Sequence, residues 1–179
     1  MGGIQLEKAL AITGWMSPVE LKWLAHVAVN SKNILEIGSY KGRSTRVLCD
    51  NTFGTVTAVD PWNGPYIKDN GSILFDQAKS WPEFERNLKD AKNLRIVKDY
   101  FSGFLKDNNE TFDFIFIDGD HRYESVLRDI AKGMEILRPK GILAGHDYTH
   151  KDWPGVRKAV DEVLPERCIV DSIWFTTKF

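Results

Sequence analysis

The sequence has 179 residues, of which 42% are hydrophobic and 27% are charged, as is typical of one globular domain. Its 24 basic and 25 acidic residues are interspersed and leave a formal net charge of −1. No basic surface is therefore indicated, and we expect no nucleic-acid partner.

Leader, membrane and cysteine signals all favour a soluble cytoplasmic protein. The N-terminus lacks a charged leader followed by an apolar stretch, and no apolar run approaches the roughly 18 residues that a membrane span needs. Cys49 and Cys168 have no C-x-x-C spacing and are predicted to be small buried hydrophobic residues. Neither a disulfide framework, a zinc site nor a membrane partner is expected.

The first predicted elements are a helix, a strand and a second helix. Ser17-Pro18-Val19-Glu20 has the pattern of a capping box with proline at the first helical position, which predicts a helix to about residue 30. Residues 33–37 form a short apolar strand that ends at Gly38, and a new helical pattern begins at Ser44. Together they predict a strand, a glycine turn and a helix.

The remaining elements alternate in the same way. Further strands are predicted at residues 55–60, 94–97, 112–117 and 141–144, with helices from 81, near 102–105, at 123–137 and at 156–163, and a closing pair of strands within 168–179. This order predicts a doubly wound Rossmann-like α/β fold. We expect a seven-stranded, mostly parallel sheet with one antiparallel strand near an edge and helices on both faces.

The domain organisation follows from the same pattern. We expect a single domain over residues 1–179, in which residues 1–31 form a helical cap segment. Residues 61–80 contain two prolines and two glycines and are predicted to be a substrate loop. We expect this loop and Trp15 and Met16, which precede the first helix, to select the substrate.

The glycine turn carries the first functional signal, Glu36-x-Gly38-x-x-x-Gly42. A dinucleotide site would have glycine in place of Glu36, because a carboxylate there would repel the pyrophosphate. An acid at the end of the strand instead suits a cofactor with an ammonium and a sulfonium group, such as S-adenosylmethionine. Asp60, at the end of the next strand, is placed to accept both hydroxyls of an adenosine ribose.

The third strand adds an adenine site, because Asp99 or Tyr100 follows it and Ser102 is next to them. The structural alternative remains that Gly38 and Gly42 are ordinary turn glycines and that Asp60 is a loop residue. The combination of the turn, Asp60 and the strand–helix–strand context favours a cofactor site.

Two later motifs carry a family resemblance: the residues 117–124, Ile-Asp-Gly-Asp-His-Arg-Tyr-Glu, and the residues 145–148, Gly-His-Asp-Tyr. With them the sequence resembles the class I, Rossmann-like S-adenosylmethionine-dependent methyltransferases, and within these a small family with I-D-G-D-H…Y-E and H-D-Y motifs. The resemblance covers the chain from about residue 15 onward. It implies that Trp62 lies beside the adenosine. The full predicted cofactor site comprises Glu36, Gly38, Ser39, Gly42, Ser44, Asp60, Trp62, Asp99, Tyr100, Ser102 and Asp118.

A second constellation follows two neighbouring strands, with Asp118, Asp120 and His121 after one and His146 and Asp147 after the other. The carboxyl ends of parallel strands meet at one edge of the sheet, so these side chains are expected in one crevice. Carboxylates and imidazoles suit Mg²⁺ or Mn²⁺.

The resemblance extends to metal-dependent O-methyltransferases, and it implies Asp118, His146 and Asp147 as metal ligands. The predicted catalytic residues are Asp118, His121 and His146, with either histidine as the general base. The alternative is structural, with the aspartates capping helices and His121 satisfied in its loop.

The expected activity is O-methylation of a small molecule, with N-methylation second. A glycosyltransferase that binds Mn²⁺ through Asp118-Gly119-Asp120 and a non-catalytic S-adenosylmethionine-binding module remain alternatives. A nicotinamide oxidoreductase is disfavoured by Glu36, and a metallohydrolase by the lack of an upstream histidine cluster. A homodimer is expected, because a chain without a cap domain often completes its cleft with a second subunit.

Overall fold

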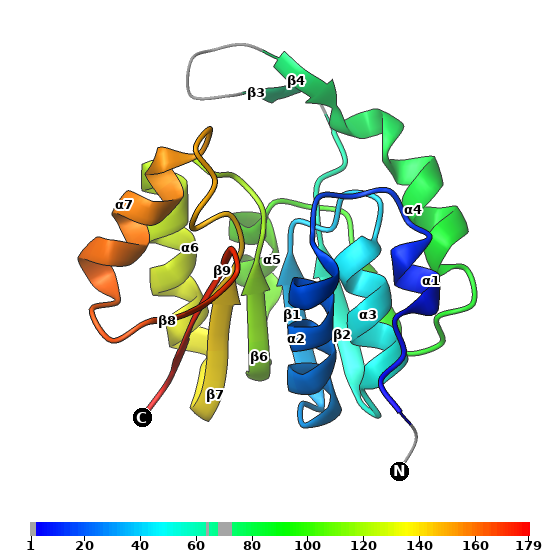
Figure 1. The fold of residues 1–179 in the computed structure, drawn as a ribbon, viewed down its shortest axis with the longest axis horizontal. Helices are drawn as coiled ribbons and strands as arrows, with labels where there is room; N and C mark the ends of the chain where they lie inside the picture. Colours follow the sequence, from blue (N-terminus) through cyan, green and yellow to red (C-terminus); the bar gives the residue numbers. More distant parts are fainter. Residues whose placement is uncertain (1–2, 64, 68–72) are drawn as a thin grey trace.

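The fold is a doubly wound α/β sandwich. The computed structural model describes residues 3–63, 65–67 and 73–179. Seven strands form one sheet in the order β5-β2-β1-β6-β7-β9-β8 (Figure 1). These strands are β1 (Asn33–Ile37), β2 (Thr55–Val59), β5 (Leu94–Val97), β6 (Phe112–Ile117), β7 (Leu137–Gly145), β8 (Cys168–Val170) and β9 (Ile173–Thr177).

The sheet is parallel from β5 to β7, and β9 pairs antiparallel with both β7 and β8. The predicted seven-stranded sheet with one antiparallel strand near its edge is therefore confirmed. In the register, Glu36 lies between Ala58 and Phe116, on the middle one of the five parallel strands β5, β2, β1, β6 and β7.

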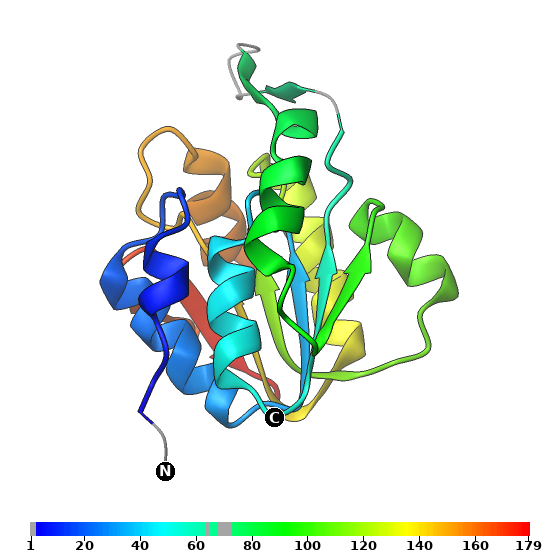
Figure 2. The same cartoon turned by 90° about the vertical axis from the view of Figure 1, so that its right-hand side faces the viewer.

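Helices cover both faces of the sheet, as predicted (Figure 2). On one face of the sheet, a hydrophobic core includes residues of α2 (Pro18–Val29), α3 (Arg43–Asn51) and α4 (Trp81–Leu88). On the other face, a second core includes residues of α5 (Phe101–Asp107), α6 (Tyr123–Ile136) and α7 (Pro154–Val163). Strand β6 contributes to both cores: Phe114 and Phe116 belong to the first, and Ile115 and Ile117 belong to the second. Alternate side chains of a strand point to opposite faces, so both faces of β6 are buried.

Several elements differ from the sequence prediction. A short helix α1 (Glu7–Leu10) precedes α2 and was not predicted. In the predicted loop 61–80, β3 (Pro65–Ile67) pairs with β4 (Ile73–Asp76), and the 3-10 turn η1 (Gln77–Lys79) follows. This hairpin projects beyond the edge at which the parallel strands end (Figure 1).

Two smaller corrections concern a strand end and a cysteine. Strand β7 begins at Leu137, directly after α6, and a register shift against β6 accommodates residues 138–141. Both cysteines are free, but only Cys49 is buried. The prediction for Cys168 is wrong because it lies on β8, a three-residue strand at the edge of the sheet. Among the described residues, no helix is long and apolar enough to cross a membrane.

Candidate active site

Two adjoining cavities lie at the carboxyl ends of the parallel strands and share Gly38, Asp60 and Gln77. The first, which we call the His121 cavity, has a volume of about 200 Å³, and the second, the Ser102 cavity, about 430 Å³. The His121 cavity is also lined by Trp15, Met16, Ser39, Ser44, Asp118, His121, His146, Asp147 and Trp153. The Ser102 cavity is also lined by Asn63, Tyr100, Ser102, Gly119, Asp120 and Ser125.

The two glycines of the turn are both required by the backbone. Gly38 and Gly42 have φ of 85°, in the left-handed region that favours glycine. A Cβ on Gly38 would overlap the backbone oxygen of Asp118, so this glycine allows the ends of β1 and β6 to approach closely. A Cβ on Gly42 would instead overlap Leu88 of α4. Only Gly38 lines the cavities, and Gly42 supports the turn from behind.

Glu36 is fully buried behind the turn and lines neither cavity. Its Oε2 accepts hydrogen bonds from Ser39 Oγ at 2.6 Å and from Thr45 Oγ1. Its Oε1 accepts no hydrogen bond of normal geometry from the described residues. Burial raises the pKa of Glu36 to about 7, against the opposing effect of the Ser39, Ser44 and Thr45 hydroxyls. Glu36 thus organises the turn from which a ligand would be held.

Asp60 ties the end of β2 to the same turn. Its Oδ2 accepts from the backbone N–H groups of Ser39 and Tyr40 at 2.9 and 3.0 Å, and its Oδ1 from that of Trp62 at 2.7 Å. Burial raises its pKa, although these three N–H groups act in the opposite direction. Since Oδ1 accepts only one of these bonds, it retains capacity for a hydroxyl donor.

The residues predicted for the adenosine separate into two groups. Tyr100 and Ser102 line the Ser102 cavity, and Tyr100 Oη donates to Asn63 Oδ1 at 3.2 Å. Trp62 and Asp99 line neither cavity. Trp62 is buried against Trp81 and Phe84, and Asp99 accepts from the N–H group of Tyr100 at the start of α5. Asn63 was missed, because the sequence gives no signal that distinguishes it within its loop.

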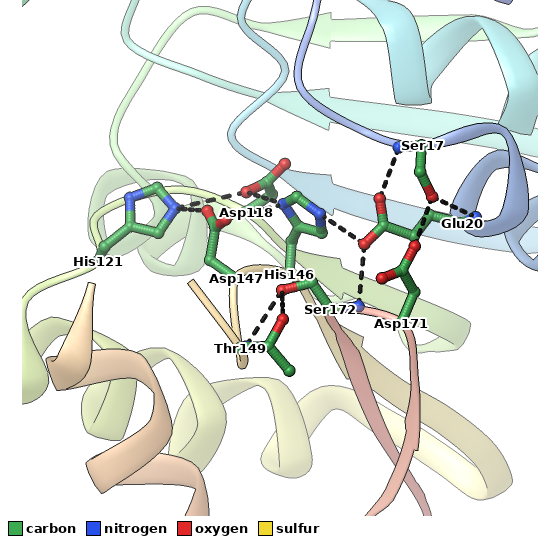
Figure 3. A network of polar contacts seen from close by, with 9 residues as sticks. All are labelled: Ser17, Glu20, Asp118, His121, His146, Asp147, Thr149, Asp171 and Ser172. Carbon is green, nitrogen blue, oxygen red and sulfur yellow. Dashed lines mark hydrogen bonds and ion pairs between the residues drawn. The ribbon is translucent and has the colours of Figure 1, made fainter. Parts of the chain in front are cut away.

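Four of the five polar residues predicted to share one crevice form one cluster after β6 and β7 (Figure 3), namely Asp118, His121, His146 and Asp147. His121 Nε2 lies 2.6 Å from Asp147 Oδ2 and 3.5 Å from Asp118 Oδ1. The His121 ring also stacks on Trp153, with centroids 4.8 Å apart. These contacts fix His121 at the wall of its cavity.

His146 lies deeper in the same cluster and has a partner that was not predicted. Its Nε2 is 3.0 Å from Glu20 Oε1, and its Nδ1 is 3.4 Å from Asp147 Oδ1 and 3.7 Å from Asp118 Oδ1. Burial lowers the pKa of His146, but the surrounding carboxylates outweigh burial and raise it well above its usual range. The capping-box pattern predicts a role for Glu20 in the helix cap, and no local pattern indicates its second contact with His146.

The charges in this cluster are unequal. Burial raises the pKa of Asp118 to about 6, although His146 opposes the shift. Burial acts on Asp147 in the same direction, yet hydrogen bonds from His121 and His146 outweigh it and hold its pKa below its usual range. The pKa of Glu20 is also lowered, because the opposing contacts with His146 and two backbone N–H groups outweigh its burial. Asp147 and Glu20 are therefore carboxylates at neutral pH.

Among the residues that the structure describes, Asp118, His121 and Asp147 form a group that could hold a metal ion, with donor atoms within 4.8 Å of one another. This group contains His121, whereas the set predicted from the sequence contains His146 in its place. His146 directs Nε2 at Glu20 on α2, and its Nδ1 lies 3.7 Å from Asp118 Oδ1 and 3.4 Å from Asp147 Oδ1. Two carboxylates and one imidazole fit Mn²⁺ well and Mg²⁺ less well.

Asp120 faces the other cavity and does not join this cluster. Its carboxylate accepts hydrogen bonds from Arg122 and from Ser125 Oγ, and it lines the Ser102 cavity. Asp118 lines the His121 cavity. The two acids of Asp118-Gly119-Asp120 therefore do not form one chelating site, and the glycosyltransferase alternative loses its support.

Comparisons with known proteins give a family and a fold. The sequence model of a methyltransferase domain family matches residues 35–148, which include the turn and both polar motifs. A search of curated protein sequences finds no match.

Solved structures similar to this chain include an O-methyltransferase from Bacillus cereus in complex with S-adenosylhomocysteine, at 19% identity and a TM-score of 0.69, covering 97% of this chain and 90% of that one. A Podospora anserina methyltransferase bound to S-adenosylhomocysteine has 14% identity and a TM-score of 0.71, covering 97% and 85%. An O-methyltransferase from Streptomyces achromogenes, in complex with S-adenosylmethionine and involved in tomaymycin synthesis, has 14% identity and a TM-score of 0.66, covering 98% and 87%. At these identities the similarity establishes the fold.

Proposed function

Because this chain belongs to the methyltransferase domain family of S-adenosylmethionine-dependent enzymes, we propose that it methylates a hydroxyl group of a small molecule. The observation that carries this proposal is the pair His121 and Asp147, 2.6 Å apart at the wall of the cleft. A hydroxyl must lose its proton when it is methylated, and a histidine oriented by a carboxylate can accept that proton.

The shape of the cleft suggests how the cofactor lies. The Ser102 cavity would hold the adenosine, with Asp60 available to the ribose and Tyr100 and Ser102 available to the base. Gly38, Ser39 and Ser44 of the His121 cavity would hold the methionine part. When bound there, S-adenosylmethionine supplies a methyl group on a sulfonium, which is reactive enough to need orientation more than activation. Glu36, Gly42 and Trp62 act through the turn and its packing.

The acceptor then lies in the part of the His121 cavity walled by Trp15 and Trp153. These aromatic walls favour a flat, largely apolar molecule that carries the hydroxyl. His121 Nε2 faces Asp147 Oδ2 at 2.6 Å, so we assign the ring proton to Nε2 and the uptake of the acceptor's proton to Nδ1. Trp153 keeps the His121 ring in place by stacking on it.

Metal assistance is a second proposal, and the grouping of Asp118, His121 and Asp147 favours it. These three residues would hold Mg²⁺ or Mn²⁺, and the ion would lower the pKa of the acceptor hydroxyl. In that case His121 would serve as a ligand and not as the base. Activity that survives a chelator would favour the base, and activity restored by Mn²⁺ alone would favour the ion.

The test has two stages. Calorimetric titration with S-adenosylhomocysteine is expected to show micromolar binding, and its absence would remove the proposal. Methyl transfer from isotopically labelled S-adenosylmethionine to a panel of small hydroxyl and amine compounds would then be followed by mass spectrometry. Transfer to amines alone would replace O-methylation by N-methylation.

Asp147→Asn tests the proposed pair directly. Asn tolerates the left-handed φ of 62° at this position, so the backbone is retained. We expect affinity for S-adenosylhomocysteine within about twofold of wild type and turnover reduced at least about 100-fold, as for loss of general-base catalysis. Asp161→Asn is the matched control, because Asp161 binds Tyr148 and Arg167 and lines neither cavity. Loss of cofactor binding in Asp147→Asn, without a folding defect, would contradict the assignment.

A further inference from the structure

Glu20 lies in the first turn of α2 and is 2% exposed, although it is a charged residue. Its two oxygens have separate partners (Figure 3). Oε2 accepts from the Ser17 N–H group at 2.7 Å, which completes the capping box of α2. Oε1 lies 3.0 Å from His146 Nε2 and accepts from the Ser172 N–H group at 3.1 Å. Only one of the two oxygens therefore serves the helix.

The contact with His146 connects α2 to the reacting groups. His146 presents Nε2 to Glu20 and its Nδ1 edge to Asp118 and Asp147. Asp147 in turn holds His121 at 2.6 Å. Glu20, His146, Asp147 and His121 thus form one continuous series of contacts from the N-terminal helix to the cavity wall.

We propose that Glu20 is a positioning residue of the active site, which fixes the His146 ring through its Nε2–H so that the opposite ring edge faces Asp118 and Asp147. The inference rests on the proposed function for its catalytic meaning. Without Glu20, the His146 ring can turn about its side-chain bond, and the two aspartates lose the group that fixes their orientation. Under this proposal, His146 in the wild-type protein is a positioning group and not the base or a metal ligand.

The choice of a carboxylate supports this role over simple capping. Glutamine completes a capping box as well as glutamate does. A buried carboxylate is costly unless it is paired and hydrogen-bonded, so capping alone gives no reason for a charge here. The partner that requires the charge is His146, 126 residues away in the sequence.

The experiment compares Glu20→Gln with Ser17→Ala in the full-length protein by NMR. Glu20→Gln retains the acceptor for the cap but weakens the partner of His146, whereas Ser17→Ala removes the cap hydrogen bond and leaves that partner. In wild type we expect a slowly exchanging His146 Nε2–H signal downfield of the amides, with a nuclear Overhauser contact to the Glu20 side chain. His146→Gln assigns the signal.

In Glu20→Gln we expect this proton to exchange at least tenfold faster than in wild type, which corresponds to a loss of about 1.4 kcal/mol. In Ser17→Ala we expect its exchange rate to stay within about twofold of wild type. An unchanged signal in Glu20→Gln would overturn the proposal. So would a wild-type protein without the signal or its contact to Glu20, and this measurement remains valid if the variant does not fold. Failure of wild type to bind S-adenosylhomocysteine would remove the proposed function and leave the ring signal as it is, so the two failures are distinguishable.

Discussion

The two halves of the cleft are built from contacts of very different range. In the cofactor half, Glu36 binds Ser39 and Thr45, three and nine residues away, and Asp60 binds Ser39 at a separation of 21. In the polar cluster, Glu20 binds His146 and Ser172 at separations of 126 and 152. A contact within one strand–turn–helix unit leaves a motif in the sequence, whereas a contact between α2 and β7 depends on the whole fold.

Gly38→Ala is expected to have the largest effect, because Gly38 joins the two halves. The variant places a side chain in the left-handed region and against the backbone oxygen of Asp118. The two penalties together predict a loss of about 3–5 kcal/mol in the free energy of unfolding. Urea unfolding measures this loss, and both S-adenosylhomocysteine binding and the His146 ring signal should disappear together.

Gly119→Ala is the matched control for Gly38→Ala. A Cβ on Gly119 would lie 3.5 Å from its nearest neighbour, which is an ordinary contact, and its φ is not in the left-handed region. We expect its stability to remain within about 1 kcal/mol of wild type. A Gly38→Ala protein as stable as Gly119→Ala would show that the ends of β1 and β6 can separate, and that the halves are less closely joined.

The two buried glutamates provide the next test, because their pKa values shift in opposite directions. Burial raises the pKa of Glu36 from 4.5 to about 7, so its contribution to stability is complete below about pH 4.5 and is lost as the pH rises through 7. The pKa of Glu20 is lowered, so its contribution is present above about pH 4.5 and is lost on acidification.

Glu36→Gln should therefore gain stability relative to wild type as the pH rises from about 5 to about 8.5, by on the order of 2–3 kcal/mol. The physical reason is that wild type must ionise a buried carboxyl group over this range and the variant does not. Denaturant unfolding at several pH values measures the difference. Glu20→Gln is the comparison, and a gain of the same sign in that variant would contradict the assigned charges.

The same difference in range explains what the sequence could predict. Strand β1 and the capping box of α2 match the prediction, because apolar runs and caps are local signals. The sequence predicts a loop where the structure has the β3–β4 hairpin, because the prolines and glycines of this segment are turn signals. These residues do not indicate which strands pair.

The site shows the same limit at the level of single side chains. Strand order brings His121, His146 and Asp147 to one edge, and this was predicted. The direction of each imidazole was not predicted, because Glu20, the partner of His146 Nε2, comes from another element of the fold. Exposure of Cys168 likewise depends on β8 being the edge strand, which spacing alone does not reveal.

Asp60→Ala is expected to have the smallest of these effects and to act on the cofactor half alone. The variant removes the proposed acceptor for the ribose hydroxyls and the carboxylate that holds the N–H groups of Ser39 and Tyr40. We expect calorimetry to show at least tenfold weaker binding of S-adenosylhomocysteine, or about 1.4 kcal/mol. Asp90→Ala is the control, because Asp90 pairs with Lys8 and Arg46 and lines neither cavity.

The His146 ring signal should persist in Asp60→Ala, since no contact of Asp60 reaches Glu20 in the described chain. Weaker binding together with loss of that signal would mean that the two halves form one cooperative unit, and unchanged affinity would remove Asp60 from the cofactor site.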